Sequence, residues 1–206
     1  MESLFDVVSC IIQLIVLAVL VFWSARQRGE TWLFQIITGA FGCYFLGTLF
    51  WTLFYFIRDD WPSIFTAADL SFIGYYCFFI AAALGLKGMW SEEERDRAGR
   101  GRAAAFVSVF VVLAAHVAYV LLAGGLVNNI LFFIPLAFLF YYTVSGIFAS
   151  GVYRRYHNAV LIVFVLELLI FLVSSFGWNS LYYVFTYIQM AAWFLIIPAA
   201  KKGAEA

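Results

Sequence analysis

Charged residues are scarce in this sequence of 206 residues, and their scarcity excludes a soluble globular domain. Lys, Arg, Asp and Glu make up 12% of the chain, whereas 66% of its residues are hydrophobic. Soluble domains carry roughly 25% charged residues, and a water-exposed fold of this size could not bury so much apolar surface. The formal net charge is zero, which leaves no basic face for nucleic acid. The composition therefore predicts an integral membrane protein whose main partner is the lipid bilayer.

Cysteine is also rare, and the motifs of common catalytic and cofactor sites are missing. Cys10, Cys43 and Cys77 lie far apart in apolar runs, which argues against a disulfide framework or zinc site and favours small buried side chains. The chain has no H-E-x-x-H, G-x-S-x-G, C-x-x-C or P-loop motif. Lys201 and Lys202 lie at the end of the last apolar run, not inside it, which disfavours a retinal site. We therefore expect a protein that is not an enzyme, with no catalytic residue, metal or cofactor.

Seven apolar runs make up most of the chain. Each is close to the ~20 residues that a helix needs to cross the hydrocarbon core, and open strands are excluded there because lipid cannot pair their backbone groups. The sequence thus predicts an all-α, polytopic membrane protein, a seven-helix bundle that forms one domain over residues 1–206. The expected helices span roughly residues 4–23, 32–57, 68–89, 103–123, 128–149, 158–176 and 180–199.

Basic residues indicate how this bundle is oriented. Eleven of the 12 Lys and Arg residues fall on one side of it, and Arg58 alone falls on the other. Cytoplasmic loops carry an excess of Lys and Arg, so we expect the amino terminus outside and the carboxyl terminus in the cytoplasm, in the inner membrane of a bacterium. The longest connection, SEEERDRAGRGR (91–102), is expected to be a solvated cytoplasmic turn. The eleven residues are Arg26, Arg28, Lys87, Arg95, Arg97, Arg100, Arg102, Arg154, Arg155, Lys201 and Lys202.

Glu167 is the one acidic residue near the middle of an expected helix. A charge at the bilayer centre costs about 2.5–3.5 kcal/mol, so the side chain should face the bundle and carry a proton or a polar partner. His116 in the fourth helix is the natural partner to test, because the depths of the two residues differ by roughly 6 Å at 1.5 Å per residue. The pair is either a buried polar switch or a structural hydrogen bond between two helices.

Asp69 stands at the outer end of the third expected helix, three residues after Thr66. This spacing matches a capping box, and a carboxylate also suits the positive end of the helix dipole. We expect Asp69 both to cap this helix and to line an outward-facing ligand pocket, because polar and aromatic residues also open the fifth and seventh helices. These candidate ligand-binding residues are Asn128, Asn129, Asn179, Tyr182 and Tyr183.

Two segments resemble a known family. The stretch PSIFTAADLSFIGYYCFFIAAALGL (62–86) resembles the membrane-integral sensor region at the amino terminus of many bacterial diguanylate cyclases and sensor histidine kinases. The stretch NSLYYVFTYIQMAAWFLIIPAA (179–200) is similar to the last helix of that region, which leads into an output domain. Here only KKGAEA follows it. The resemblance implies a stand-alone sensor module, a truncated chain or a shared seven-helix scaffold.

We therefore predict a membrane sensor or receptor that binds a small or lipophilic ligand from the outer side. It would signal through a cytoplasmic partner or as a homo-oligomer. The alternative is a small-solute transporter with a 3+1+3 parallel helix repeat, because residues 69–84 align faintly with residues 180–195. A membrane enzyme acting on lipid ranks last, since only Glu167, His116 and Asp69 could serve it.

The orientation can be checked with reporter fusions at residues 30, 97 and 155. All three should report a cytoplasmic location, because each lies among the basic residues on one side of the bundle. A periplasmic signal from any one of them would contradict the orientation.

Overall fold

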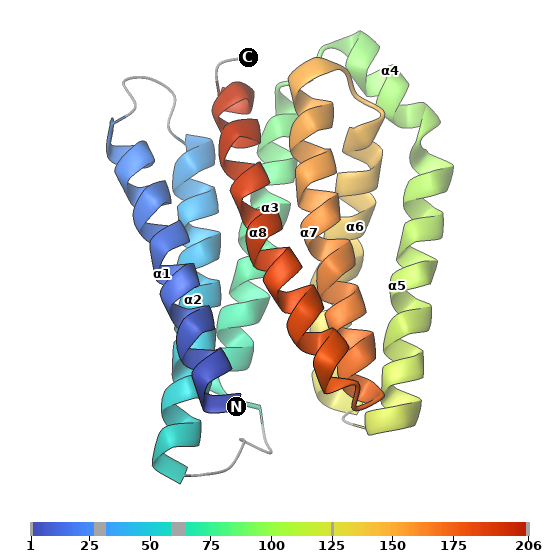
Figure 1. Ribbon diagram of the computed structural model, residues 1–206. Helices are drawn as coiled ribbons and strands as arrows, with labels where there is room; N and C mark the ends of the chain where they lie inside the picture. Colours follow the sequence, from blue (N-terminus) through green and yellow to red (C-terminus); the bar gives the residue numbers. More distant parts are fainter. Residues whose placement is uncertain (1, 27–31, 59–64, 125, 205–206) are drawn as a thin grey trace. The chain divides into compact units, whose positions relative to one another are not determined.

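The computed structural model describes residues 2–26, 32–58, 65–124 and 126–204, and all the long elements in these ranges are α-helices (Figure 1). Seven of the helices are long and apolar enough to cross a membrane, which confirms the expected multi-pass helical protein. The helices are α1 (Glu2–Arg26), α2 (Trp32–Arg58), α3 (Ala67–Gly88), α4 (Glu92–Arg100), α5 (Arg102–Ala123), α6 (Leu126–Ile147), α7 (Gly151–Ser175) and α8 (Asn179–Ala204).

Two expectations about the connections were wrong. The connection after α3 is not a plain solvated turn, because Ser91 and Glu94 form a reciprocal capping box that starts the short helix α4. The Ser91 backbone N–H donates to Glu94 at 3.1 Å, and the Glu94 N–H donates back to the Ser91 hydroxyl at 3.3 Å. Helix α7 begins at Gly151, not near residue 158, so Arg154 and Arg155 lie inside a helix.

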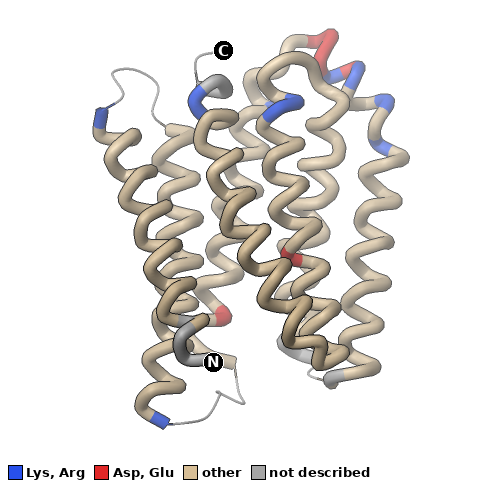
Figure 2. The backbone as a smooth tube through the Cα atoms, in the orientation of Figure 1, with Lys and Arg blue, Asp and Glu red and all other residues tan. Residues whose placement is uncertain are grey.

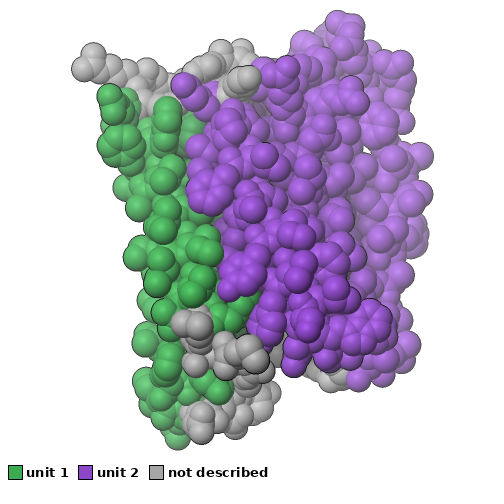
Figure 3. Space-filling view, in the orientation of Figure 1, with its two compact units in different colours: residues 1–79 green, residues 80–206 purple. Residues whose placement is uncertain are grey.

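Contacts between residues divide the chain into two compact units, residues 1–79 and residues 80–206, which Figure 3 shows in different colours. The boundary falls inside α3, so the last part of that helix belongs to the second unit. The expectation of one domain over the whole chain stays a prediction.

Small residues on α2 allow close helix packing in the first unit. Gly39 and Gly47 lie two turns apart on α2, and a Cβ on either would come within 3.0 Å of an aromatic ring of α3, Phe78 or Phe72 respectively. The ring of Trp51 also packs edge-on against Phe72, with centroids 5.1 Å apart. Lipid supplies no hydrophobic drive for helix association, so this close van der Waals contact joins α2 to α3.

The cysteines are free, but they are less buried than expected. Cys77 is exposed on α3, and Cys10 and Cys43 are partly buried. Cys10 Sγ lies 3.4 Å from the hydroxyl oxygen of Thr52, which links α1 to α2.

Helix α7 is the central element of the second unit, since it packs against α5, α6 and α8. The ring of Phe171 on α7 stacks on Tyr119 of α5, with centroids 4.0 Å apart. At Gly146, α6 presents bare backbone to His157 of α7, and a Cβ there would fall 2.1 Å from the imidazole ring. The glycine is therefore required for this close contact between α6 and α7.

The Lys and Arg residues of the second unit gather at the end of the unit that carries α4, whereas the opposite end is almost free of charge (Figure 2). This distribution is the one that the positive-inside rule associates with a cytoplasmic face. The orientation of the chain in a membrane stays a prediction.

The substitution Gly146→Ala should destabilise the protein by about 1–3 kcal/mol, because the added methyl overlaps the buried ring of His157. Gly99→Ala in α4 is the matched control, since a Cβ at Gly99 meets no atom within 4 Å. Alanine favours a helix over glycine, so the control should be neutral or slightly stabilising. Thermal unfolding in detergent micelles measures both. Equal melting temperatures would contradict the packing of His157 on Gly146.

Candidate functional site

Glu167 is paired with a side chain of the neighbouring helix. Gln189 of α8 donates its Nε2 to Glu167 Oε2 at 3.1 Å and to the backbone carbonyl of Val163 at 3.4 Å. Gln189 is 1% exposed, and Glu167 is partly buried. The expectation that Glu167 contacts a polar side chain is confirmed, and the contact joins α7 to α8.

His116 lies in a different environment from the one expected. Its Nδ1 lies 2.9 Å from the carbonyl oxygen of Val112, one turn earlier on the same helix. Its ring packs against Phe171 of α7 and Phe133 of α6, with centroids 4.9 and 5.7 Å away. Gln189 is thus a partner of Glu167, and His116 forms part of an aromatic contact among α5, α6 and α7.

Asp69 forms one half of the expected capping box. Its Oδ2 accepts the backbone N–H of Thr66 at 2.7 Å and the Thr66 hydroxyl at 2.8 Å. The hydroxyl therefore bonds to the carboxylate, whereas in a full capping box it would accept the N–H of Asp69. The predicted capping role is confirmed in this form.

The other candidates for an outer pocket belong to the second unit. Asn129 donates its side-chain amide to the carbonyl of Gly124 at 3.2 Å, which closes the start of α6. Asn179 is exposed at the start of α8, and the rings of Tyr182 and Tyr183 contact each other at 5.6 Å. The side chain of Asn128 lies outside the described residues. A ligand pocket that combines these residues with Asp69 stays a prediction.

An apolar groove of about 370 Å³ lies between α5 and α6, and nothing in the sequence indicated it. It is lined almost wholly by aliphatic and aromatic groups, and several of them are exposed at its rim, including Phe106 and Phe138. A pocket of roughly 300–1,000 Å³ is the usual size for a small-molecule ligand. Its lining residues are Phe106, Val109, Phe133, Ile134, Ala137, Phe138, Tyr141 and Tyr142.

The groove is connected to the rest of the second unit through ring contacts. Phe133, in the lining, contacts His116, which in turn contacts Phe171 of α7. At the end near α4, Tyr142 lies beneath the ammonium group of Lys87, with 5.4 Å between Nζ and the ring centroid. A ligand in the groove would therefore touch Phe133, which is linked to α7 through His116, and Tyr142, which contacts Lys87 in the last turn of α3.

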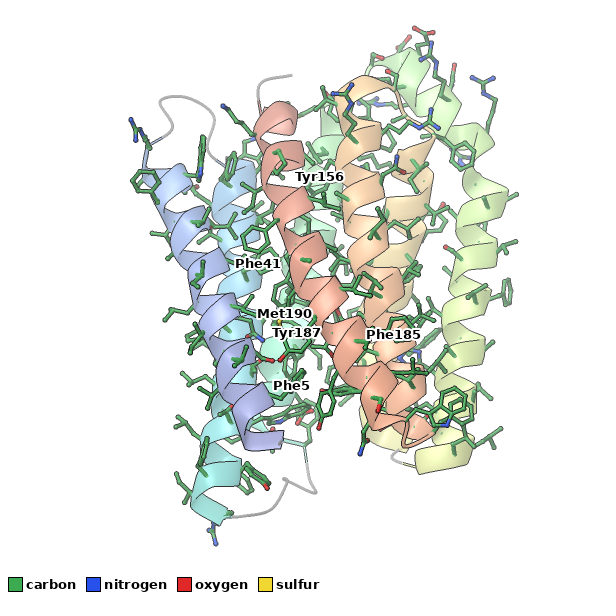
Figure 4. All side chains as sticks on the ribbon, in the orientation of Figure 1. Phe5, Phe41, Tyr156, Phe185, Tyr187 and Met190 are labelled. Carbon is green, nitrogen blue, oxygen red and sulfur yellow. The ribbon has the colours of Figure 1, made fainter. Side chains whose placement is uncertain are left out.

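A second group of residues that the sequence did not indicate is centred on His157 of α7. His157 is 1% exposed, and in the described part of the chain neither ring nitrogen has a hydrogen-bond partner. Its ring contacts those of Trp90, at 6.2 Å, and Tyr156, at 5.4 Å. Tyr156 lies toward the end of α7 nearer α4 (Figure 4). The turn after α3 is thus held against α7 by buried aromatic residues.

Helix α4 is attached to the turn between α6 and α7. The Ser150 hydroxyl donates to Glu94 Oε1 at 2.8 Å. Gly101, at the carboxyl end of α4, lies so close to Phe148 that a Cβ would fall 2.2 Å from its ring. A shift of the α6–α7 turn would therefore displace α4 through these two contacts.

The described residues contain no group of three or more His, Cys, Asp or Glu side chains arranged to hold a metal ion. A scan against protein-family models and searches of curated proteins and of solved structures found no match to this chain. The resemblance to bacterial sensor regions therefore stays a prediction.

Replacement of Glu167 tests its contact with Gln189. Glu167→Leu should cost about 1–3 kcal/mol, because it removes an acceptor from the buried amide of Gln189. Glu167→Gln keeps a side-chain oxygen in place and should cost much less. Thermal unfolding in detergent compares the two variants with the wild type, and equal losses would contradict a role for the hydrogen bond.

Proposed function

We propose that this chain is a multi-pass membrane sensor that binds a small lipophilic ligand in the α5–α6 groove and relays its occupancy to α4. The observation that carries the proposal is the groove itself, an apolar pocket of ligand size with aromatic walls. A lipophilic compound that partitions into a bilayer would reach such a groove directly from the lipid. The proposed ligand route differs from the outer-side entry expected from the sequence.

Two sets of contacts support a relay from the groove. The first runs from Phe133 through His116 to Phe171, so that a displaced groove wall presses on α7. The second runs along α6 to the α6–α7 turn, where Ser150 bonds to Glu94. Both end on elements that contact α4 or its attachment.

Helix α4 is suited to present the signal to a partner. It is short, highly charged and largely exposed, and it is held by one side-chain hydrogen bond to Ser150 and by the close contact at Gly101. The basic end of the second unit would face the cytoplasm of a bacterial cell by the positive-inside rule. A cytoplasmic signalling partner, or a second copy of the chain, would then read the position of α4.

A small-solute transporter with a parallel 3+1+3 repeat is the second candidate. The first compact unit holds α1, α2 and most of α3, which is the size of one such triplet. Transport would appear as uptake of sugars or amino acids into proteoliposomes, without any ligand-dependent change at α4.

Amide hydrogen exchange in lipid nanodiscs tests the sensor proposal, with 1-dodecanol as a neutral lipophilic probe. Dodecanol should change the exchange of residues 92–100 in a saturable way, because α4 is tied to the α6–α7 turn. Val109→Trp, which fills the groove, should abolish the response, whereas Val107→Trp is the matched control on an exposed position of the same helix.

A third variant separates binding from relay. Ser150→Ala removes the hydrogen bond to Glu94, so dodecanol should still protect the groove while α4 no longer responds. The proposal fails if dodecanol leaves α4 unchanged in the wild type, or if Val107→Trp and Val109→Trp behave alike.

A further inference from the structure

We infer that the α5–α6 groove is a site for an anionic lipid of the surrounding bilayer, with its acyl chain in the groove and its headgroup at Lys87 and Arg102. The inference rests on the proposed function, because it names the chemical class of ligand that the groove takes. It is carried by two basic side chains at one end of an apolar groove.

The first basic group stands at the end of a continuous row of rings. Lys87 Nζ lies 5.4 Å from the ring centroid of Tyr142, and Tyr142 contacts Tyr141 at 5.4 Å. Tyr141 in turn meets Phe106 of α5 edge-on at 5.2 Å. This row crosses from α6 to α5 and includes three lining residues of the groove. Lys87 is therefore fixed beside the groove and is not simply one of many charges at a helix end.

The second basic group follows from the helical register of α5. Arg102 precedes the lining residues Phe106 and Val109 by four and seven positions, so the three share one face of the helix. Arg102 is also the first residue of α5, where the helix dipole already favours an anion and disfavours a cation. Its placement therefore does not serve helix stability, and it adds to a positive field at the groove end.

Neither cation is neutralised by the described residues. The one ion pair in the described part of the chain joins Arg97 to Glu93 within α4. Glu94 accepts hydrogen bonds from Ser91 and Ser150. Lys87 and Arg102 thus remain available to a phosphate.

The source of the anion follows from the continuity of the groove with the lipid-facing surface. Phe106, Ile134 and Phe138 are about half exposed on this face, in helices long enough to cross a membrane. A free phosphate would leave the apolar wall of the groove without a ligand. A phospholipid places an acyl chain against this wall and its phosphate at the basic end. The cytoplasmic leaflet, where the basic end is expected, is also the more anionic one.

Native mass spectrometry of protein released from mixed nanodiscs of phosphatidylcholine and phosphatidylglycerol tests the inference. The wild type should retain phosphatidylglycerol in excess over its share of the disc. The double variant K87Q/R102Q should lose this excess, by about fivefold for each charge removed. The charge-conserving K87R/R102K should keep it, and so should the control R154Q/R155Q, which neutralises two exposed basic residues of the same unit away from the groove. Val109→Trp should reduce the retention of both lipids.

Four results would overturn the inference. The first is a lipid ratio in the wild type equal to that of the disc. The second is an equal loss of the phosphatidylglycerol excess in R154Q/R155Q, which would indicate an unspecific interfacial lipid. The third is undiminished lipid retention in Val109→Trp, and the fourth is displacement of phosphatidylglycerol by inorganic phosphate. Its failure is distinguishable from that of the sensor proposal, because neutral dodecanol should still bind and alter α4 in K87Q/R102Q. If phosphatidylglycerol binds but α4 never responds, the site stands and the sensor proposal falls.

Discussion

The hydrocarbon core of the bilayer offers no hydrogen-bond partner to a protein, and most features of this chain follow from that constraint. Helices satisfy their own backbone, so they form the long apolar elements of the described chain. Hydroxyl groups bond back to the carbonyl one turn earlier, as Thr52 does to Thr48 at 2.8 Å and Thr186 to Tyr182 at 2.8 Å. Because lipid tails are as apolar as the helices, association must come from close packing, and glycines stand where rings of adjacent helices approach.

The same constraint explains why the sequence predicted the helices well and their partners poorly. Length and apolarity alone locate a membrane helix, but an apolar surface on every side does not reveal which face turns inward. Glu167 required a polar partner, but the sequence does not show whether this is His116 or Gln189. The choice depends on how each helix is rotated about its axis. The capping role of Asp69 was predicted correctly because capping is local, set by a spacing of three residues from Thr66. Ser91 and Glu94 show the same spacing of three residues, so the start of α4 is also set by local sequence.

Aromatic side chains make many of the contacts between the helices of the second unit. Around α7, ring contacts link three helices through His116, Phe133 and Phe171. Rings also join the turn after α3 to α7, through Trp90 and His157. Their ring centroids lie 4.9–6.2 Å apart, within the range of about 4.5–7 Å that favourable aromatic pairs occupy.

On the proposed function, α6 is the element through which the groove acts. Pro135 lies inside this helix, between the lining residues Ile134 and Ala137. Proline cannot donate to the carbonyl four residues earlier, so the helix is weakened beside the ligand. After Pro135, α6 continues to Gly146, which contacts His157. The turn that follows α6 holds α4 through Ser150. A ligand that spreads α5 from α6 would bend α6 at its weakest position, and the displaced half would carry α4 with it.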